Sequence, residues 1–314
     1  MKILVTGGAG YIGQVLTPLL LQKGYSVRVA DALIFGQSPL ENADRAFEFI
    51  KGDLRDEAVL KSTLEGIDLI MHLAALVGEP ACGKNPSLTN EINVGVVEKL
   101  NQLRGDTPLI FLSTSSVYGE EPSYQRCFED QTEPLPQLPY AKSKYEAEKI
   151  IRDAGDSYII LRPATAFGFS PRLRLDLLPN EFTFKAVKFK YLEIYDPHFM
   201  RTFIHVTDLS RGIIMMIENF DKLKGQVFNL GDHNLNVTKK TLVDILRSKI
   251  DLEVKFVENT TDLDKRNFIV SYDKIAKRGF KTEVSLEAGL SELIEVFKKI
   301  EAHPSFYNVN FHLS

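Results

Sequence analysis

Three glycines near the start of the chain constrain its fold more than any other feature. Gly7, Gly10 and Gly13 follow an apolar run at residues 2–6, and a helical pattern at 11–22 comes next. In a turn from strand to helix, glycines permit a sharp bend and close approach of the backbone to a bound group. The helix start then offers N–H groups and a positive dipole end to phosphate. The segment predicts a strand, a phosphate-binding turn and a helix.

The spacing of these glycines is G-x-x-G-x-x-G, whereas most dinucleotide-binding dehydrogenases carry G-x-G-x-x-G, so a plain tight turn is the alternative. The next predicted strand, 26–30, is followed by Asp31. A carboxylate about 20 residues beyond the turn can bind both ribose hydroxyls of an adenosine. It would repel the 2′-phosphate of NADP and therefore predicts NAD, although Arg28 and Arg45 leave NADP open. An aspartate that simply begins a loop is the other interpretation.

The composition is that of an ordinary globular chain. Of the 314 residues, 44% are hydrophobic and the formal net charge is −4, so no nucleic-acid partner is expected, because that would require a basic face. Two cysteines, Cys82 and Cys127, are too few for a disulfide framework, and the histidines lack metal-ligand spacing, so no metal is expected. Because a strand is predicted from residue 2 and no apolar stretch has membrane-spanning length, we expect a cytoplasmic protein without membrane contact.

Short β patterns alternate with helical patterns up to about residue 163, which is typical of an α/β fold with a doubly wound parallel sheet of the Rossmann type. The strands expected there are 2–6, 26–30, 47–51, 69–73, 109–113 and 157–162. We expect an NAD-binding domain at 1–163 and a smaller α/β region at 164–314 that binds substrate, with segments around 203–231 returning to the first domain. A strand at 202–206 and helices at 238–249 and 286–300 are also expected.

A tyrosine and a lysine four residues apart supply candidate chemistry. On a helix, Tyr140 and Lys144 would share one face. A nearby ammonium and a positively charged nicotinamide stabilise a phenolate, so Tyr140 could accept a proton from an alcohol. Thr114, after a predicted strand, could hydrogen-bond a substrate oxygen. The alternatives are an exposed tyrosine with a solvated lysine and the start of a serine-rich loop.

Together these motifs make the chain similar to the extended short-chain dehydrogenase/reductase superfamily, specifically its nucleotide-sugar epimerases, dehydratases and dehydrogenases. The resemblance covers nearly the whole chain and rests on Thr6-Gly-Gly-Ala-Gly-Tyr-Ile-Gly13, Gly52-Asp53-Leu54, His72-Leu-Ala-Ala75, Asn93, the Ser/Thr-rich segment 112–119, Tyr140 with Lys144, Leu161-Arg-Pro163 and Arg201-Thr-Phe-Ile-His-Val-Thr-Asp208. It implies an NAD-dependent oxidoreductase that removes a hydride from carbon 4 of a nucleotide-activated sugar. A 4-keto sugar and a homodimer with a four-helix interface are implied as well.

The resemblance also implies a role for each site residue. The catalytic residues would be Thr114, Tyr140 and Lys144. The cofactor would lie against Gly7, Gly10, Tyr11, Ile12, Gly13, Asp31, Asp53, Leu54, Ala74, Ala75, Tyr140 and Lys144. The sugar nucleotide would lie against Ser115, Ser116, Asn180, Tyr195, Arg201 and Arg266, and Asn93 would support the active-site helix. Arginine suits a diphosphate because its guanidinium donates paired hydrogen bonds, with exposed cations as the alternative for Arg201 and Arg266.

The chemistry after the first oxidation differs between the subfamilies. Ser115 and Ser116 stand where 4,6-dehydratases carry an Asp and a Glu, and hydroxyls cannot replace that acid and base at neutral pH, which disfavours dehydration. Segments 77–82, 171–178 and 264–266 are similar to bacterial GDP-heptose 4-dehydrogenases, whereas 113–116 is typical of sugar 4-epimerases, so both activities stay open. A non-catalytic NAD-bound regulatory or structural protein and a reductase of a non-sugar carbonyl are the rival functions. Cys82 is expected on a loop near the substrate, as a packed thiol or an extra acid or base.

Overall fold

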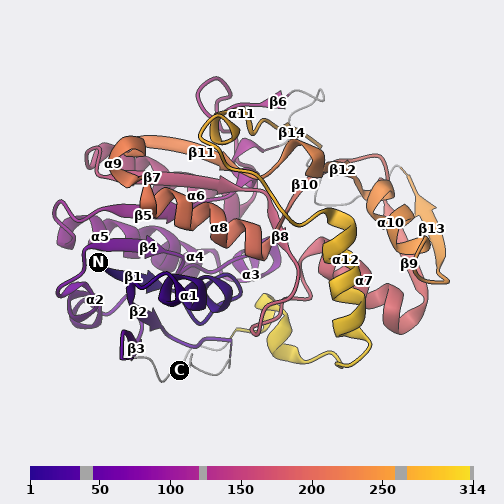
Figure 1. Ribbon diagram of the computed structural model, residues 1–314, viewed down its shortest axis with the longest axis horizontal. Helices are drawn as coiled ribbons and strands as arrows, with labels where there is room; N and C mark the ends of the chain where they lie inside the picture. Colours follow the sequence, from indigo (N-terminus) through magenta and orange to yellow (C-terminus); the bar gives the residue numbers. More distant parts are fainter. Residues whose placement is uncertain (36–44, 120–125, 259–266, 312–314) are drawn as a thin grey trace.

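A parallel seven-stranded sheet forms the centre of the protein (Figure 1), seen in a computed structural model that describes residues 1–35, 45–119, 126–258 and 267–311. Its strands lie in the order β11-β7-β5-β4-β1-β2-β3, and all neighbours run parallel. They are β1 (Lys2–Thr6), β2 (Ser26–Asp31), β3 (Phe47–Lys51), β4 (Leu69–His72), β5 (Leu109–Leu112), β7 (Tyr158–Pro163) and β11 (Gln226–Leu230). The predicted α/β class with a doubly wound parallel sheet is confirmed.

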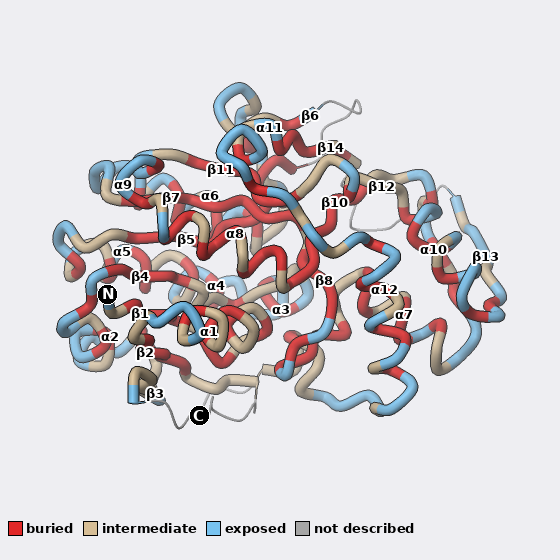
Figure 2. The backbone as a smooth tube through the Cα atoms, in the orientation of Figure 1, coloured by how far each residue is buried: buried red, intermediate tan, exposed pale blue. Residues whose placement is uncertain are grey.

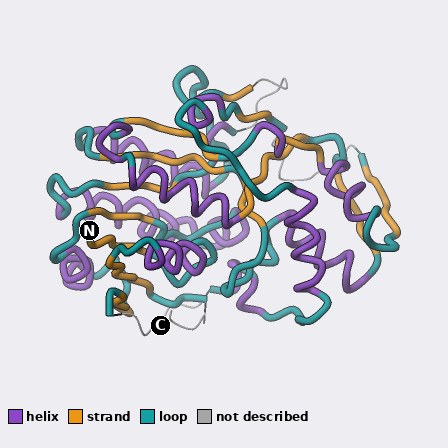
Figure 3. Tube along the Cα trace, in the orientation of Figure 1, coloured by secondary structure: helices purple, strands orange, loops and turns teal. Residues whose placement is uncertain are grey.

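Helices cover both faces of this sheet (Figure 3). On one face lie α1 (Gly13–Gln22) and α8 (Val206–Glu218), and on the other lie α2 (Glu57–Leu64), α5 (Val96–Leu103) and α6 (Pro139–Asp153). Ile3 and Val5 of β1 pack with the first group, whereas Leu4 packs with the second. This follows from the alternation of side chains along a strand, and it makes the sheet the most continuously buried part of the chain (Figure 2).

The six strands expected from the sequence differ from the observed ones by no more than one residue at either end. The helix expected at 11–22 begins two residues later, at Gly13. β11 was not expected as a strand. It lies within the 203–231 segment and joins the large sheet beside β7.

The later part of the chain builds a second cluster of elements, which Figure 1 shows beside the carboxyl-end side of the large sheet. A three-stranded sheet joins β8 (Thr165–Phe167), β10 (Met200–His205) and β12 (Asn236–Thr238), and β9 (Tyr191–Tyr195) pairs with β13 (Glu253–Val257). α7 (Leu178–Phe189), α10 (Lys239–Arg247) and α12 (Leu286–Phe297) surround a core of their own. β10, α10 and α12 correspond to the strand and the two helices expected there.

Short elements complete the described chain. They are α3 (Glu79–Lys84), α4 (Pro86–Asn90), the π-helix η1 (Glu91–Gly95), η2 (Ser115–Tyr118), β6 (Arg126–Cys127), α9 (Phe220–Leu223), η3 (His233–Leu235), β14 (Ile269–Val270), α11 (Asp273–Ala276), η4 (Pro304–Phe306) and η5 (Asn308–Asn310). Among the described residues, we find no helix with the length and apolar character needed to cross a membrane.

A buried ion pair joins α6 to the sheet. The Arg162 Nη2 lies 2.6 Å from the Glu148 Oε2, and both side chains are at most 1% exposed. Arg162 also donates to the Tyr118 hydroxyl at 3.2 Å, and the Ser113 hydroxyl donates to Glu148. Removing one partner of such a pair leaves an uncompensated buried charge. The contact therefore fixes where α6 lies on the sheet.

We predict that Glu148→Gln lowers the free energy of unfolding by about 3 kcal/mol, because the Arg162 guanidinium keeps its buried position without a carboxylate. Urea unfolding of the full-length chain measures this. Glu146→Gln is the matched control, since Glu146 lies on the same helix and its partner Lys149 is half exposed; its midpoint should stay close to that of the parent. Equal midpoints for the two variants would contradict the prediction.

Candidate active site

A cavity of about 1030 Å³ lies along the carboxyl ends of the central strands and is lined by residues from both parts of the chain. This is where open α/β sheets bind their ligands. Most of the predicted site residues line it: Gly7, Gly10, Tyr11, Ile12, Gly13, Asp31, Asp53, Leu54, Ala74, Ala75, Thr114, Ser116, Tyr140, Lys144, Tyr195 and Arg201. The fold therefore brings together motifs that are far apart in the sequence.

The turn at the end of β1 has no room for a side chain at Gly7 or Gly13. Gly7 has φ +67°, and a Cβ added there would lie 2.7 Å from the backbone of Ala74. A Cβ on Gly13 would lie 2.3 Å from the carbonyl oxygen of Gly8. Both distances are far below van der Waals contact, so only glycine keeps the turn this tight. The first turn of α1 is thereby brought to the cavity with its N–H end forward, as a pyrophosphate requires.

Asp31 ends β2 at the edge of the same cavity. Its carboxylate accepts hydrogen bonds from the N–H groups of Ala9, at 3.0 Å, and Leu33, at 2.8 Å. Burial raises the pKa of this carboxyl, and the two backbone N–H groups oppose that shift. These contacts hold the carboxylate in place beside the glycine turn, where it suits the ribose of an adenosine.

Arg28 does not stand where a 2′-phosphate would need it. Its Nε donates to Glu48 at 2.8 Å, and its Nη1 donates to the carbonyl oxygens of Thr63 and Glu65 at 2.9 and 2.8 Å. The guanidinium thus binds the carbonyl oxygens at the C-terminal end of α2, and neither Arg28 nor Arg45 lines the cavity. The sequence left Arg28 open as a phosphate partner, and its contacts within the fold remove it from that role.

Tyr140 and Lys144 lie in the first two turns of α6 and face the cavity with Thr114, which follows β5. Burial raises the pKa of the Tyr140 hydroxyl, and a hydrogen bond with Thr114 opposes that shift. Burial lowers the pKa of the Lys144 ammonium to about 7, with Glu148 opposing. The ammonium lies 4.1 Å from the centre of the Phe111 ring. All three groups line the same cavity.

Two further side chains hold the start of α6. The Glu79 carboxylate accepts the backbone N–H of Tyr140 at 3.1 Å. Asn93, in the π-helix η1, donates to the Ser143 hydroxyl at 3.0 Å and to the Leu76 carbonyl oxygen at 2.9 Å. These contacts hold the N-terminal part of α6, which carries the residues that face the cavity.

The predicted substrate residues divide into three groups. Ser116, Tyr195 and Arg201 line the cavity, and the Arg201 Nη1 donates to the Met200 carbonyl oxygen at 3.0 Å. Ser115 and Asn180 do not line it. The Asn180 amide is used inside the protein, since it accepts the Gly168 N–H at 3.1 Å and donates to the Arg174 carbonyl oxygen at 2.9 Å. Arg266 lies outside the described residues.

Cys82 lies in α3 and not on a loop as expected. Its side chain is fully buried, and the thiol donates to the Leu76 carbonyl oxygen at 3.3 Å. Burial raises the pKa of this thiol to about 12. Of the two alternatives left by the sequence, the structure favours a packed thiol over an acid or base that works at neutral pH.

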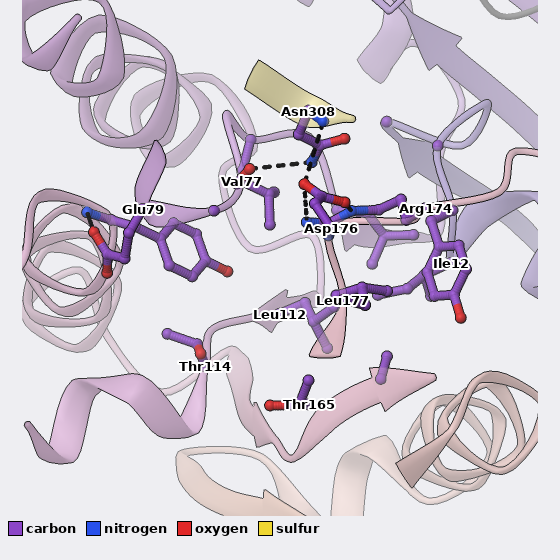
Figure 4. A pocket seen from close by; sticks show the side chains of 18 of the residues that line it. Ile12, Val77, Glu79, Leu112, Thr114, Thr165, Arg174, Asp176, Leu177 and Asn308 are labelled. Atoms are coloured by element: carbon purple, nitrogen blue, oxygen red, sulfur yellow. Dashed lines mark hydrogen bonds and ion pairs between the residues drawn. The ribbon is translucent and has the colours of Figure 1, made fainter. Parts of the chain in front are cut away.

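Among the polar residues of the cavity wall that the sequence analysis missed are Arg172, Arg174, Asp176 and Asn308. Arg174 and Asp176 form a bidentate ion pair, in which Nε donates to Oδ1 at 2.9 Å and Nη2 donates to Oδ2 at 3.0 Å. Asp176 also accepts a hydrogen bond from the backbone N–H of Asn308 at 3.2 Å. Figure 4 shows these three on one side of the cavity, with Thr114 and Thr165 lower in the view. Arg172, Arg174 and Asp176 alternate with Leu173 and Leu175 along the chain, and this alternation is the sequence signal that could have identified them.

Comparison with known proteins places this geometry in a family. The model of the NAD dependent epimerase/dehydratase family matches residues 3–231. The UDP-glucose 4-epimerase of Lacticaseibacillus casei is 31% identical over 258 residues, which cover 74% of this chain and 76% of that protein.

Two solved structures show the same fold over nearly the whole chain. The UDP-glucuronic acid 4-epimerase from Bacillus cereus, in complex with UDP-glucuronic acid and NAD, is 26% identical with a TM-score of 0.82, covering 95% of this chain and 99% of that one. The dTDP-glucose 4,6-dehydratase from Streptomyces venezuelae, with NAD bound, is 27% identical with a TM-score of 0.82, covering 95% and 97%.

The cofactor prediction fits these findings. The family is NAD dependent, and the cavity carries both the tight glycine turn and the carboxylate that this dinucleotide needs. The predicted NAD is thus confirmed, as is the resemblance to nucleotide-sugar epimerases and dehydratases. On its sequence, its fold and its cavity, this chain belongs to the NAD dependent epimerase/dehydratase family.

Proposed function

We propose that this enzyme oxidises carbon 4 of a nucleotide-activated sugar and that Thr114, Tyr140 and Lys144 carry out the proton transfer. The observation that carries the proposal is the meeting of these three side chains, the glycine turn and Asp31 in one cavity. A regulator without turnover has no need of all three reactive groups beside the cofactor site. A reductase of an apolar carbonyl has no use for the basic residues of the opposite wall.

In the proposed step, the Tyr140 phenolate takes the proton of the sugar hydroxyl while the C–H bond of the same carbon breaks. Bound NAD supplies the acceptor for the hydride. Thr114 donates a hydrogen bond to the sugar oxygen and keeps it near Tyr140, and the Lys144 ammonium stabilises the phenolate. Burial raises the pKa of the Tyr140 hydroxyl and lowers that of Lys144, so formation of the phenolate relies on the positive charges that the bound nicotinamide and Lys144 bring to the site.

The opposite wall suits a sugar nucleotide. Arg201 and Lys239 line it together with Tyr195, and the Lys239 Nζ donates to the Tyr195 carbonyl oxygen at 2.9 Å. Two cations beside an aromatic ring can take a diphosphate and the base attached to it. We assign the nucleotide to this wall. The homodimer and the cytoplasmic location stay predictions.

The ketone has two fates that the residues support: release by a 4-dehydrogenase, or return of the hydride to the other face by a 4-epimerase. Ser116 offers a hydroxyl where dehydration needs a carboxyl group. The proposal is tested by incubating the protein and NAD with UDP-, GDP-, CDP- and dTDP-sugars, heptoses included, in deuterated water, separating the products by chromatography and analysing them by mass spectrometry. Loss of two hydrogens identifies a dehydrogenase, and an isomer of unchanged composition identifies an epimerase. Loss of water from the sugar, or no change in any substrate, would contradict the proposal.

We predict that Tyr140→Phe lowers turnover by about a thousandfold, because the general base is lost, while bound NAD is retained. The rate of sugar conversion and the absorbance of the bound cofactor measure the two effects. Tyr145→Phe is the control, since Tyr145 lies on the same helix and its hydroxyl contacts Glu133 outside the cavity. A near-normal rate in Tyr140→Phe would rule out the assigned base.

We predict that Lys144→Met moves the rising limb of the pH profile upward by about one unit or more, because a phenolate without a neighbouring ammonium forms only at higher pH. The measurement is kcat/KM between about pH 6 and 10 with the cofactor saturating. A lower rate with an unchanged profile would mean that Lys144 acts only by packing.

We predict that Asp31→Ala weakens NAD binding by about tenfold or more and NADP binding much less. The reason is that only NAD has a free 2′-hydroxyl on the adenosine ribose, from which the carboxylate would accept a hydrogen bond. Calorimetric titration with each dinucleotide measures the two dissociation constants. Asp221→Ala, on the short helix α9 away from the cavity, serves as control. Equal losses for both dinucleotides would refute the ribose assignment.

A further inference from the structure

Arg172 is a buried cation in the cavity wall that the proposed proton transfer does not use. Its side chain is 5% exposed and lines the cavity. The guanidinium carbon lies 4.5 Å from the centre of the Phe35 ring. The Nη2 donates to the Asn308 Oδ1 at 2.7 Å and the Nη1 to the Leu173 carbonyl oxygen at 3.2 Å. The Nε–H, in contrast, has no hydrogen-bond partner among the described residues.

The segment that carries Arg172 is attached to the glycine turn. The Tyr11 hydroxyl donates to the Gly168 carbonyl oxygen at 2.7 Å, and the Ser170 hydroxyl donates to the Tyr11 carbonyl oxygen at 2.7 Å. Arg172 therefore follows, by two residues, a point that is bonded to the turn. The two segments form neighbouring walls of one cavity.

The contact with Phe35, four residues after Asp31, places Arg172 toward the adenosine end of the cofactor site. Burial, helped by the nearby Arg174, lowers the pKa of Arg172 to about 10, while Asp176 and Asp31 oppose that shift. Asp31 is the carboxylate assigned to the adenosine ribose, and Phe35 follows it in the chain. A buried guanidinium with an unused N–H in this position suits an anion that lies between the ribose and the turn.

We propose that Arg172 binds the pyrophosphate of NAD from the cavity wall that neighbours the glycine turn. The phosphates would then lie between the N-terminus of α1 and this guanidinium. The proposal rests on NAD as cofactor and is independent of which sugar is oxidised. The diphosphate of the sugar nucleotide is the other anion of matching chemistry, and we assign that one to the wall with Arg201.

Asn308 is the positioning residue for this contact. It holds the Arg172 guanidinium through its Oδ1, donates from its Nδ2 to the Val77 carbonyl oxygen at 3.1 Å, and donates its backbone N–H to Asp176. The Leu175 N–H also donates to the Phe306 carbonyl oxygen at 2.9 Å. The C-terminal segment is therefore part of the cofactor site, although it follows the glycine turn by nearly the whole length of the chain.

The test is calorimetric titration of the full-length Arg172→Gln variant with NAD, ADP-ribose and adenosine, together with titration of its NAD-loaded form with UDP and GDP. We expect dissociation constants for NAD and ADP-ribose to rise between about ten- and hundredfold, because a charge-assisted hydrogen bond to phosphate is lost. Adenosine, UDP and GDP should change less than about threefold. Arg278→Gln, an exposed arginine after α11, is the control.

Two results would overturn the proposal: unchanged affinity for NAD and ADP-ribose, or weaker binding of UDP and GDP with NAD unaffected. The second would transfer Arg172 to the substrate diphosphate. Asn308→Ala provides a second variant if Arg172→Gln folds poorly. It should weaken the same two ligands by a smaller factor, and unchanged binding of both would remove Asn308 from the site. Because every readout is an affinity, a failure of the proposed sugar oxidation would not affect the result.

Discussion

The close approach of backbone to backbone at the glycine turn is the constraint on which the rest of the site depends. Gly7 lies against Ala74 after β4, and Gly13 lies against Gly8, with no space for a Cβ at either position. Because β1 lies inside the sheet, between β4 and β2, this turn places the N-terminus of α1 at the carboxyl ends of the neighbouring strands. The cofactor position follows from that placement. Every other group of the site must be arranged around it.

The helix α6 is the element that must match the cofactor. Tyr140 and Lys144 face the cavity only if this helix neither slides nor rotates on the sheet. The buried pair of Glu148 and Arg162 acts at one point, and the contacts of Glu79 and Asn93 act near the first turn. A buried ion pair gives little net stability compared with an apolar contact, but it penalises any arrangement that separates the charges. Its value here is that it fixes the place of Tyr140 and Lys144, the residues proposed to carry the proton transfer.

The sequence was most informative where structure is local. The central strands could be predicted to within a residue because most are short apolar runs, buried on both faces, between clear turn signals, and the partly buried edge strand β3 lies between such signals too. The glycine turn and the pair of Tyr140 and Lys144 have fixed spacings within one or two elements. The residues that were missed or placed differently are defined by distant contacts. Asn308 is held in the cavity wall by contacts with Arg172, Asp176 and Val77, each more than a hundred positions earlier. From the sequence, Arg28 could bind a phosphate, but in the structure carbonyl oxygens at the end of α2 accept its hydrogen bonds.

How firmly the cofactor is held bears on how the reaction ends. A 4-epimerase returns the hydride to the same sugar, so its reduced cofactor must stay bound while the ketone turns in the cavity. A 4-dehydrogenase that releases its ketone must then exchange or reoxidise the reduced cofactor before the next cycle. A pyrophosphate held on one side by α1 and on the other by Arg172 would leave slowly, since most differences in affinity appear in the dissociation rate. With Arg172 in its proposed role, and Asn308 supporting it, the same cofactor molecule would serve many turnovers.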